Sequence, residues 1–486
     1  MSRNRGLADR LRRLVTPAHD VVEPVAGKRL RLSGRGTRIP IPDNPIEIEL
    51  GKERLHIQQD TGVRDPIPRD PTHDEPPEFI VFNPDRYFSG IGYALRLQSG
   101  RSLRISHEEK YQAHLFNLPR EAFRRNFQVD HDGDSLAFRD PISELGTYVT
   151  VLPHPIGESA LVQRRRVARA RLIEIFGGAI DMLSPQRALD VIRRVNELLI
   201  EDPYRRLDQS GNPGGVVEIP AAPTPVIVGD LHANVDNLLK LLSEGALLQS
   251  LEEQTAVLVF LGDVAHPDRE PLDYMDSSVL IMDFLFMLKL RFPAGVVVLR
   301  GNHESFSPEL GKGGIPQALL WEKRLTELRG ETYREQMARF YELSPVLALS
   351  PDFLACHAGP TRARVSIDDI VNIRRHPGLA HQLTWNRIRR GTYPHGYVAG
   401  DVRRFRKSLG LNPHLPFLVG HYPYADEGTL WLDVGGIRDH HVVYSSRPDK
   451  IGIFTRVDDD IVPLVLPAEP LLATLADASA RASATT

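Results

Sequence analysis

The sequence contains a single cysteine, Cys356, among 486 residues. One thiol cannot form a disulfide within the chain, and a zinc site built from cysteines needs several of them. The chain by itself therefore has neither a disulfide framework nor a cysteine-based metal site. This composition suits a reducing compartment, and we expect the protein in the cytoplasm.

The sequence also lacks a charge surplus and long apolar segments. Its 60 Lys and Arg nearly balance its 63 Asp and Glu, so no overall basic field favours nucleic acid. No stretch reaches the roughly 18–20 apolar residues that cross a bilayer. The first residues, MSRNRGLADRLRRLV, are basic, but the apolar stretch of a secretory signal does not follow them. We therefore predict a protein that binds neither nucleic acid nor membranes.

The composition changes along the first part of the chain, and two or three domains are expected for this length. Residues 1–77 begin basic and continue rich in Pro, Gly and charge, which predicts an irregular region. Residues 78–153 contain short alternating segments such as EFIVFN and TYVTVL between turn signals, which predicts a small all-β module. Residues 154–183 are predicted to form a helical linker.

Residues 184–467 predict an α/β domain. Ser184 and Pro185 are typical of the start of a helix. Apolar β-branched segments then alternate with helical segments such as NVDNLLKLLSEG, and this alternation indicates a layered α/β arrangement. Residues 468–486 are rich in Ala and Ser, and we expect a disordered tail.

Five of the predicted strands end in residue types that bind metals. These residues are Asp230, His232, Asp263, Asn302, His357 and His421. Taken alone, a histidine such as His357 is more often structural than a ligand. If the strands are neighbours, however, their ends meet at one edge, where clustered carboxylates repel one another unless a cation neutralises them.

The candidate ligands are two Asp, one Asn and three His, with no sulfur. Mixed oxygen and imidazole ligands suit Mn²⁺, Fe or Zn²⁺ better than Ca²⁺. Six ligands are too many for one catalytic ion that keeps a coordination position free. They fit two ions that share one carboxylate. Such a pair can hold a hydroxide and clamp a phosphoryl group for in-line displacement. We therefore predict two divalent metal ions, with Mn²⁺ as the first choice and Fe or Zn²⁺ as alternatives.

The segments GDLHANVDNLL, LGDV, LRGNHES, CHAG and VGH, in this order, resemble the signature of calcineurin-like metallophosphoesterases. More narrowly, they resemble the phosphoprotein phosphatase family. The resemblance implies an α/β fold, a metallophosphoesterase β-sandwich flanked by helices, here preceded by a small all-β module.

The same resemblance implies a role for each residue of the motifs. The implied ligands of the first metal are Asp230, His232 and Asp263. Those of the second metal are Asp263, Asn302, His357 and His421, so that Asp263 bridges the two ions. His303 would be the general acid that protonates the leaving oxygen, a role that suits imidazole. Glu304 would orient the turn and take no part in the reaction.

The loop after Asp263 departs from the family pattern. The family has an Asp that orients the general acid, and an Arg that binds phosphate, where this chain has His266 and Pro267. The loop is longer here, and three of its residues could supply the missing carboxylate. They are Asp268, Asp273 and Asp276. We select Asp268 because Arg269 follows it, and a guanidinium can bind phosphate through two hydrogen bonds.

The family also places a phosphate-binding arginine after a Trp-containing segment. The corresponding text, WNRIRRGTYPHG, offers Arg387, Arg389 and Arg390. The sequence does not separate them, and Arg389 and Arg390 are taken as the candidates.

The all-β module closes on SLAFRDPISELGTYVTVL, which resembles the end of a forkhead-associated domain. Such domains bind phosphothreonine, and by resemblance Arg101 and Arg125 would contact that phosphate. Leu145 replaces an asparagine of the family pattern, and a histidine of the pattern is missing as well. The alternative is an unrelated small β-sandwich.

These features together predict a metal-dependent phosphomonoesterase. The first choice is a serine/threonine protein phosphatase that uses a metal-bound hydroxide and acts on a phosphorylated protein. One alternative is a hydrolase of small phosphate esters such as dinucleoside polyphosphates. A second alternative is a phosphate-binding scaffold with little catalysis.

Overall fold

The computed structural model describes residues 20–23, 25–32, 36–59, 79–92, 94–105, 127–140, 146–153, 160–267, 275–311, 315–390, 395–457 and 459–476. The chain divides into two compact units, Met1–Val167 and Ala168–Thr486. Among the described residues, no helix is both long enough and apolar enough to cross a bilayer.

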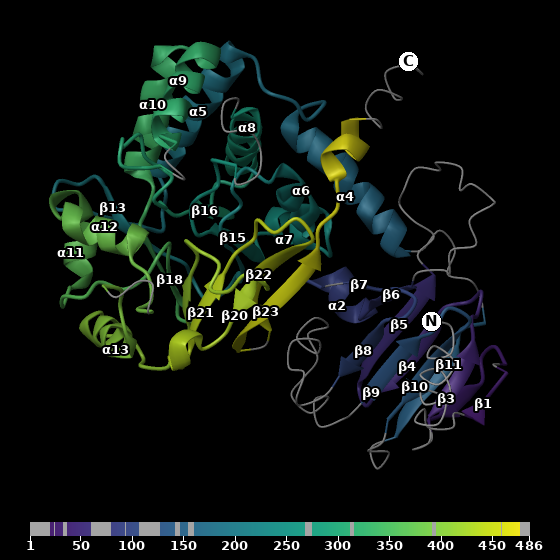
Figure 1. Ribbon diagram of the computed structural model, residues 1–486. Helices are drawn as coiled ribbons and strands as arrows, with labels where there is room; N and C mark the ends of the chain where they lie inside the picture. Colours follow the sequence, from purple (N-terminus) through teal and green to yellow (C-terminus); the bar gives the residue numbers. More distant parts are fainter. Residues whose placement is uncertain are drawn as a thin grey trace, which may run out of the picture. The chain divides into compact units, whose positions relative to one another are not determined.

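The first unit contains two β-sheets, with strand orders β1-β3-β10-β9-β8 and β2-β11-β4-β5-β6-β7 (Figure 1). Its elements are β1 (Asp20–Val21), β2 (Arg29–Arg31), β3 (Thr37–Pro40), β4 (Ile46–Leu50), β5 (Glu53–Gln59), β6 (Phe79–Phe82), α2 (Pro84–Ser89), β7 (Ala94–Leu97), β8 (Ser102–Ile105), β9 (Phe127–His131), β10 (Ser135–Arg139) and β11 (Thr147–Val151). The helix α4 (Ala160–Phe176) runs across the boundary between the units.

The prediction of an irregular region over residues 1–77 is wrong for the part that forms β1 to β5. β4 reads IEIEL, and its Ile and Leu side chains are buried while its Glu side chains are half-buried. This is the period of a strand with one face in a core. β4 pairs with β5 across a turn at Gly51, whose φ of 74° suits glycine. Prolines and charged residues surround these short strands, so the alternation of apolar and polar residues is difficult to recognise in the sequence.

The resemblance of the first unit to a forkhead-associated domain stays a prediction. Arg101 lies on the surface, directly before β8. Arg125 and Leu145 lie outside the described residues.

The second unit alternates helices and strands. Its elements are α5 (Pro185–Ile200), β12 (Arg205–Leu207), β13 (Pro213–Glu218), β14 (Thr224–Val228), α6 (Val235–Ser243), α7 (Leu247–Glu252), β15 (Ala256–Phe260), α8 (Asp276–Arg291), β16 (Val296–Val298), α9 (Gln317–Arg329), α10 (Glu331–Leu343), β17 (Leu347–Leu349), β18 (Leu354–Cys356), α11 (Ile367–Val371), η3 (Ile373–Arg375), α12 (Pro377–Trp385), α13 (Ala399–Ser408), β19 (Phe417–Val419), β20 (Leu430–Trp431), η4 (Val434–Gly436), β21 (His440–Val443), β22 (Lys450–Val457) and β23 (Asp460–Pro467).

The strands of this unit form two sheets that pack face to face. Their orders are β12-β13-β17-β18-β19-β21-β20 and β16-β15-β14-β22-β23. Apolar side chains of both sheets share one core, among them Val217, Ile227, Val259, Ala355, Leu418 and Phe454. Burial of these side chains is the main force that holds the sheets together.

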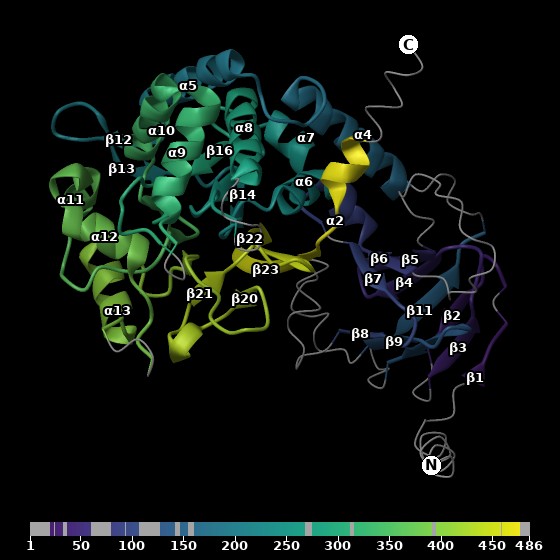
Figure 2. The ribbon, with the colours of Figure 1, turned by 45° about the horizontal axis from the view of Figure 1, so that its top comes forward.

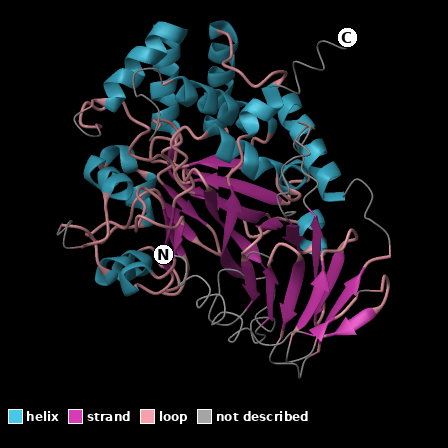
Figure 3. Cartoon of the chain, turned by 45° about the vertical axis from the view of Figure 1, so that its right-hand side comes forward, coloured by secondary structure: helices cyan, strands magenta, loops and turns pink. Residues whose placement is uncertain are grey.

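Helices cover both outer faces of the sandwich. Side chains of α11, α12 and α13 pack on the seven-stranded sheet, and Figure 2 shows these helices together. α6, α7 and α8 lie against the five-stranded sheet, and Figure 3 shows helices beside the strands at the centre of the picture. The predicted α/β sandwich flanked by helices is thereby confirmed.

The C-terminal segment is ordered further than predicted. β22 pairs antiparallel with β14, which places it inside the five-stranded sheet. After β23, Leu471 and Leu475 are buried one helical turn apart. The amide of Leu472 donates to Asp236 Oδ1 over 2.7 Å. The prediction of a disordered tail is therefore wrong for residues 468–476.

Candidate active site

Five strands bring their carboxyl ends to one edge of the sandwich. β14, β15 and β16 are parallel neighbours in one sheet, and β18 and β19 are parallel neighbours in the other. The residues that follow these ends are the six candidate ligands. Asp230, His232, Asp263, Asn302, His357 and His421 are all buried, with at most 9% of each residue exposed.

The first group of ligands is Asp230, His232 and Asp263, whose ligand atoms lie within 4.8 Å of one another. His232 Nε2 is 3.8 Å from Asp230 Oδ2. His232 Nδ1 lies 3.0 Å from the carbonyl oxygen of His266, to which it donates. A carbonyl behind an imidazole fixes the tautomer, so Nε2 is the atom presented to the carboxylates.

The second group is Asp263, His357 and His421, again within 4.8 Å of one another. His357 Nδ1 donates to the carbonyl oxygen of Leu261 over 2.9 Å, and His357 Nε2 is 3.3 Å from Asp263 Oδ2. Asn302 Oδ1 lies 2.9 Å from His357 Nε2 and 2.8 Å from His421 Nδ1. Asp263 thus belongs to both groups.

This donor set fits two divalent cations that share Asp263. Buried carboxylates of like charge are costly to hold together without a cation between them. Glu304 lies beside Asp263, and burial raises its pKa, with a further rise from the Asp263 charge. Convergent carboxylate, amide and imidazole donors suit Mn²⁺, Fe or Zn²⁺.

Glu304 links the turn after β16 to the turn after β15 through hydrogen bonds. Its carboxylate accepts hydrogen bonds from the amides of Gly301 (2.8 Å), Asp263 (2.8 Å) and Val264 (3.1 Å). The amide of His303 donates to Asp263 Oδ1 over 2.8 Å. A Cβ at Gly301 would lie 2.3 Å from Asp263 Oδ1, so only glycine permits this approach. The structural role predicted for Glu304 agrees with these contacts.

The turns that carry the candidate ligands contain several residues with strained backbone. Five residues other than glycine have positive φ there. They are His232 (44°), Ala233 (59°), Asp263 (51°), His266 (66°) and His421 (72°). Left-handed backbone costs L-residues free energy and is typical of functional sites.

His303 lies near the carboxylate of Asp263. It is less buried than the candidate ligands, with 13% of its side chain exposed. Its Nε2 is 3.8 Å from Asp263 Oδ2. Its Nδ1 is 2.7 Å from Nδ1 of His266. Burial lowers the pKa of His303 well below its usual value, and the imidazole of His266 lowers it further.

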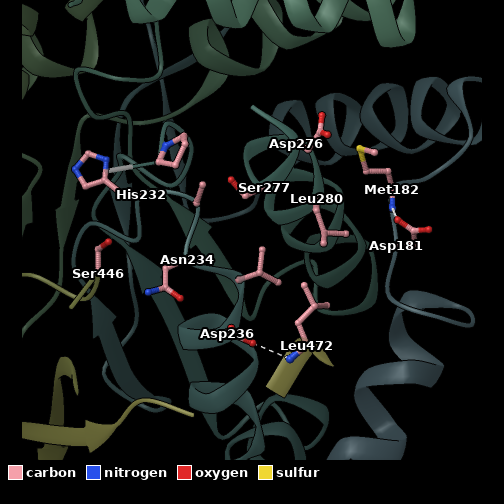
Figure 4. A pocket seen from close by; sticks show the side chains of 13 residues that line it. Asp181, Met182, His232, Asn234, Asp236, Asp276, Ser277, Leu280, Ser446 and Leu472 are labelled. Atoms are coloured by element: carbon pink, nitrogen blue, oxygen red, sulfur yellow. Dashed lines mark hydrogen bonds between the residues drawn. The ribbon is translucent and has the colours of Figure 1, made fainter. Parts of the chain in front are cut away.

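The partner predicted for His303 was an aspartate of the longer loop. Asp268, Asp273 and Arg269 lie outside the described residues. Asp276 accepts a hydrogen bond from Arg324 Nε over 3.1 Å. It lines a cavity of about 460 Å³, and Figure 4 shows it on the opposite side of that cavity from His232. Among the described residues, the side chain that contacts His303 Nδ1 is that of His266, and the choice of Asp268 stays a prediction.

The structure places a different arginine at the site from the two that were selected. Arg387 Nε donates to His421 Nε2 over 3.1 Å, and Arg387 lines a cavity of about 390 Å³ together with His303. Arg389 is exposed. Arg390 donates to the carbonyl oxygen of Tyr424, and its guanidinium lies 3.5 Å from the centre of the Tyr424 ring. Of the three arginines, Arg387 is the one that contacts a candidate ligand, and the selection of Arg389 and Arg390 stays a prediction.

A contact of the preceding residue explains why Arg387 lies beside the candidate ligands. Asn386 is buried, and its amide nitrogen donates to the carbonyl oxygen of Pro360 over 2.8 Å. Pro360 follows CHAG, the segment that carries His357. The residue directly after Asn386 is therefore held beside the ligands.

Comparisons with known proteins agree with this geometry. Residues 224–446 match the calcineurin-like phosphoesterase family. A serine/threonine-protein phosphatase of Caenorhabditis elegans, C23G10.1, is 26% identical over 156 residues, 31% of this chain and 30% of that protein. The chain thus spans less than a third of that relative's length. The serine/threonine-protein phosphatase PP1-1 of Saccharomyces cerevisiae is 23% identical over 269 residues, 49% of this chain and 76% of that protein.

One solved structure with a similar arrangement is a protein serine/threonine phosphatase from Saccharomyces cerevisiae with similarity to human phosphatase PP5. The sequence identity is 16% and the TM-score is 0.45, over 59% of this chain and 91% of that one.

Proposed function

Because residues 224–446 match the calcineurin-like phosphoesterase family, we propose that this chain is a metal-dependent phosphomonoesterase that acts on phosphorylated serine or threonine in proteins. The observation that carries the proposal is the position of Asp263 in both ligand groups. A shared carboxylate is what a two-metal phosphoesterase requires. His303 and Arg387 lie on the same cavity as the ligands and complete the set of groups that the reaction needs.

In this proposal the six strand-end residues would hold the two ions, and Mn²⁺ is the first choice, with Fe or Zn²⁺ as alternatives. Bound divalent ions supply activation of the attacking water and neutralise charge on the phosphate. Arg387 binds phosphate oxygens through its guanidinium, which presents several donors in one plane. His303 delivers a proton from Nε2 to the leaving oxygen.

The choice of a phosphorylated protein as substrate rests on the similarity of this chain to serine/threonine-protein phosphatases. It is tested by measuring phosphate release from a phosphothreonine peptide and from a dinucleoside tetraphosphate, with Mn²⁺ added. We expect the peptide to be turned over at least about 10-fold more efficiently, and a chelator to abolish both activities. Preference for the dinucleotide would assign the chain to small phosphate esters. Phosphate binding without hydrolysis of either substrate would support the scaffold.

The position of Arg387 predicts a large effect on substrate affinity. Arg387→Ala removes the charged donor beside His421, and we expect kcat/KM for the peptide to fall about 100-fold, chiefly through KM. Arg389→Ala, two residues away on the surface, is expected to change kcat/KM less than about 3-fold. Steady-state kinetics of both variants with the same peptide checks this. A larger loss for Arg389→Ala would restore the original selection.

A further inference from the structure

His266 has no part in the mechanism so far, although its side chain contacts the general acid. We propose that His266 Nδ1 accepts the Nδ1–H of His303 and so positions His303 to donate its other proton to the leaving oxygen. His266 is then a positioning residue, and the inference rests on the function proposed above.

The contact between the two rings is a hydrogen bond by its geometry. The Nδ1 atoms are 2.7 Å apart, and the ring planes are inclined by 62°, so the rings do not stack. Two nitrogens at this distance must share one proton, since two lone pairs or two N–H groups would repel each other. One Nδ1 is therefore the donor and the other is the acceptor.

His266 is held rigidly enough to orient its neighbour. The residue is fully buried, and its amide donates to Ser278 Oγ over 2.9 Å. Its carbonyl oxygen accepts from His232 Nδ1, and its ring meets Trp321 edge to face with centres 5.8 Å apart. Both the backbone and the ring of His266 are thus fixed by described neighbours.

The role of His303 as the general acid determines which of the two Nδ1 atoms donates and which accepts. An acid form of His303 carries protons on both nitrogens, so its Nδ1 can only donate, and His266 Nδ1 must accept. In the reaction the His303 Nε2–H bond breaks and an O–H bond forms on the leaving alkoxide. His303 remains neutral, with its Nδ1–H still bonded to His266, and no proton passes to His266. The single ring proton of His266 therefore sits on Nε2.

The other ring nitrogen of His266 destabilises the fold, which supports a functional reason for a histidine at this position. His266 Nε2 is buried without a hydrogen-bond partner among the described residues. A buried polar atom without a partner destabilises a fold, and phenylalanine would fill similar space without that cost. The polar contact at Nδ1 is what phenylalanine would lose.

The leaving-group dependence of the reaction tests the proposal. A threonine alkoxide needs a proton in order to leave, whereas nitrophenolate hardly does. For His266→Phe we expect turnover of a phosphothreonine peptide to fall about 100-fold, and turnover of p-nitrophenyl phosphate to fall less than about 5-fold. His266→Asp, which offers another acceptor to His303 Nδ1–H, is expected to restore peptide turnover to within about 10-fold of the original. The control is His440→Phe, the same change at another fully buried histidine, which is expected to keep the ratio of the two rates.

The outcomes separate this inference from the proposed function. Equal losses on both substrates, or no recovery in His266→Asp, would overturn the role of His266 while the phosphatase assignment stands. An original protein that releases phosphate from neither substrate would overturn the proposed function and this inference with it.

A spectroscopic measurement adds a readout that does not depend on activity. In the full chain with ¹⁵N-labelled histidine, we expect a scalar coupling between the two Nδ1 atoms across the hydrogen bond. The directly bonded proton should belong to His303, whose signals are identified by their loss in His303→Ala. A proton bonded to His266 Nδ1, or no coupling, would contradict the proposal.

Discussion

Asp263→Asn is expected to lower phosphate release by at least about 10³-fold, the largest effect of any single substitution that we predict. Asparagine keeps the size of the side chain and can still accept the hydrogen bond from the His303 amide. It removes the negative charge that serves both ligand groups. We therefore expect the bound metal to fall from two ions per chain toward none.

Metal content and phosphate release, measured together, check this expectation. The matched control is Asp190→Asn, the same change at an exposed position of α5, which should alter neither quantity. In the metal-free state Asp263→Asn should be no less stable than the original, because the substitution relieves repulsion with Glu304. Retained turnover, or two ions still bound, would remove Asp263 from the bridging position.

Arg329→Met is expected to destabilise the second unit by about 3–5 kcal/mol at neutral pH. Arg329 Nη2 lies 2.7 Å from Asp283 Oδ2, and their side chains are 2% and 1% exposed. Asp283 Oδ2 also accepts from the amide of Leu183 over 2.8 Å, and Arg329 donates to the carbonyl oxygen of Leu183. The pair ties the middle of α8 and the end of α9 to the segment just before α5. Removing the arginine leaves a buried carboxylate without its counter-charge.

The loss should depend on pH with a definite sign. Burial raises the pKa of Asp283 to about 6 although Arg329 opposes the shift, and its unfolded value is near 3.8. A folded pKa above the unfolded one gives stability that is present below about pH 4 and is lost as the pH rises through about 6. Without Arg329 the pKa of Asp283 rises further. The variant should therefore recover part of its stability, relative to the original, between pH 7 and pH 5.

Denaturant unfolding at pH 7 and pH 5 measures both effects. Asp283→Leu combined with Arg329→Met should recover at least about half of the loss, because an apolar pair replaces the buried charges. Arg194→Met removes an exposed pair with Glu197 and should leave the midpoint unchanged. A loss in Arg329→Met no greater than in Arg194→Met would show that the buried pair does not stabilise the fold.

The fold of the second unit could be predicted from local patterns. Each ligand-bearing strand is a short apolar run followed by a polar residue, and such runs identify both the strands and their ends. The start of α5 was likewise predictable, since Ser184 and Pro185 occupy the expected positions. What the sequence could not show is that the five strand ends come from two sheets. That grouping depends on which apolar faces pack together.

The parts of the site that escaped prediction depend on contacts between distant segments. The sequence gives no reason to select His266 as the partner of His303, because His266 is not a carboxylate. The contact between the two residues requires Glu304 to hold the turns after β15 and β16 together. Arg387 and Arg389 are equivalent as residue types, and only the folded segment separates the one beside His421 from the one on the surface. In the first unit, the Ile and Glu alternation of β4 was present in the sequence but lay among prolines and charges.

The pairing of β14 with β22 has a consequence for how the protein is made. β14, which leads to Asp230, pairs with a strand far later in the chain, with Val226 opposite Thr455. The carbonyl oxygen of Asp230 also accepts from the amide of Ser445. At about 5–20 residues per second, a ribosome takes ~10–50 s to supply that partner after β14 has been made. During this time one edge of β14 is open to other strands, and the metal-binding edge cannot be complete. The nascent chain can therefore complete the candidate site only after β22 has been made.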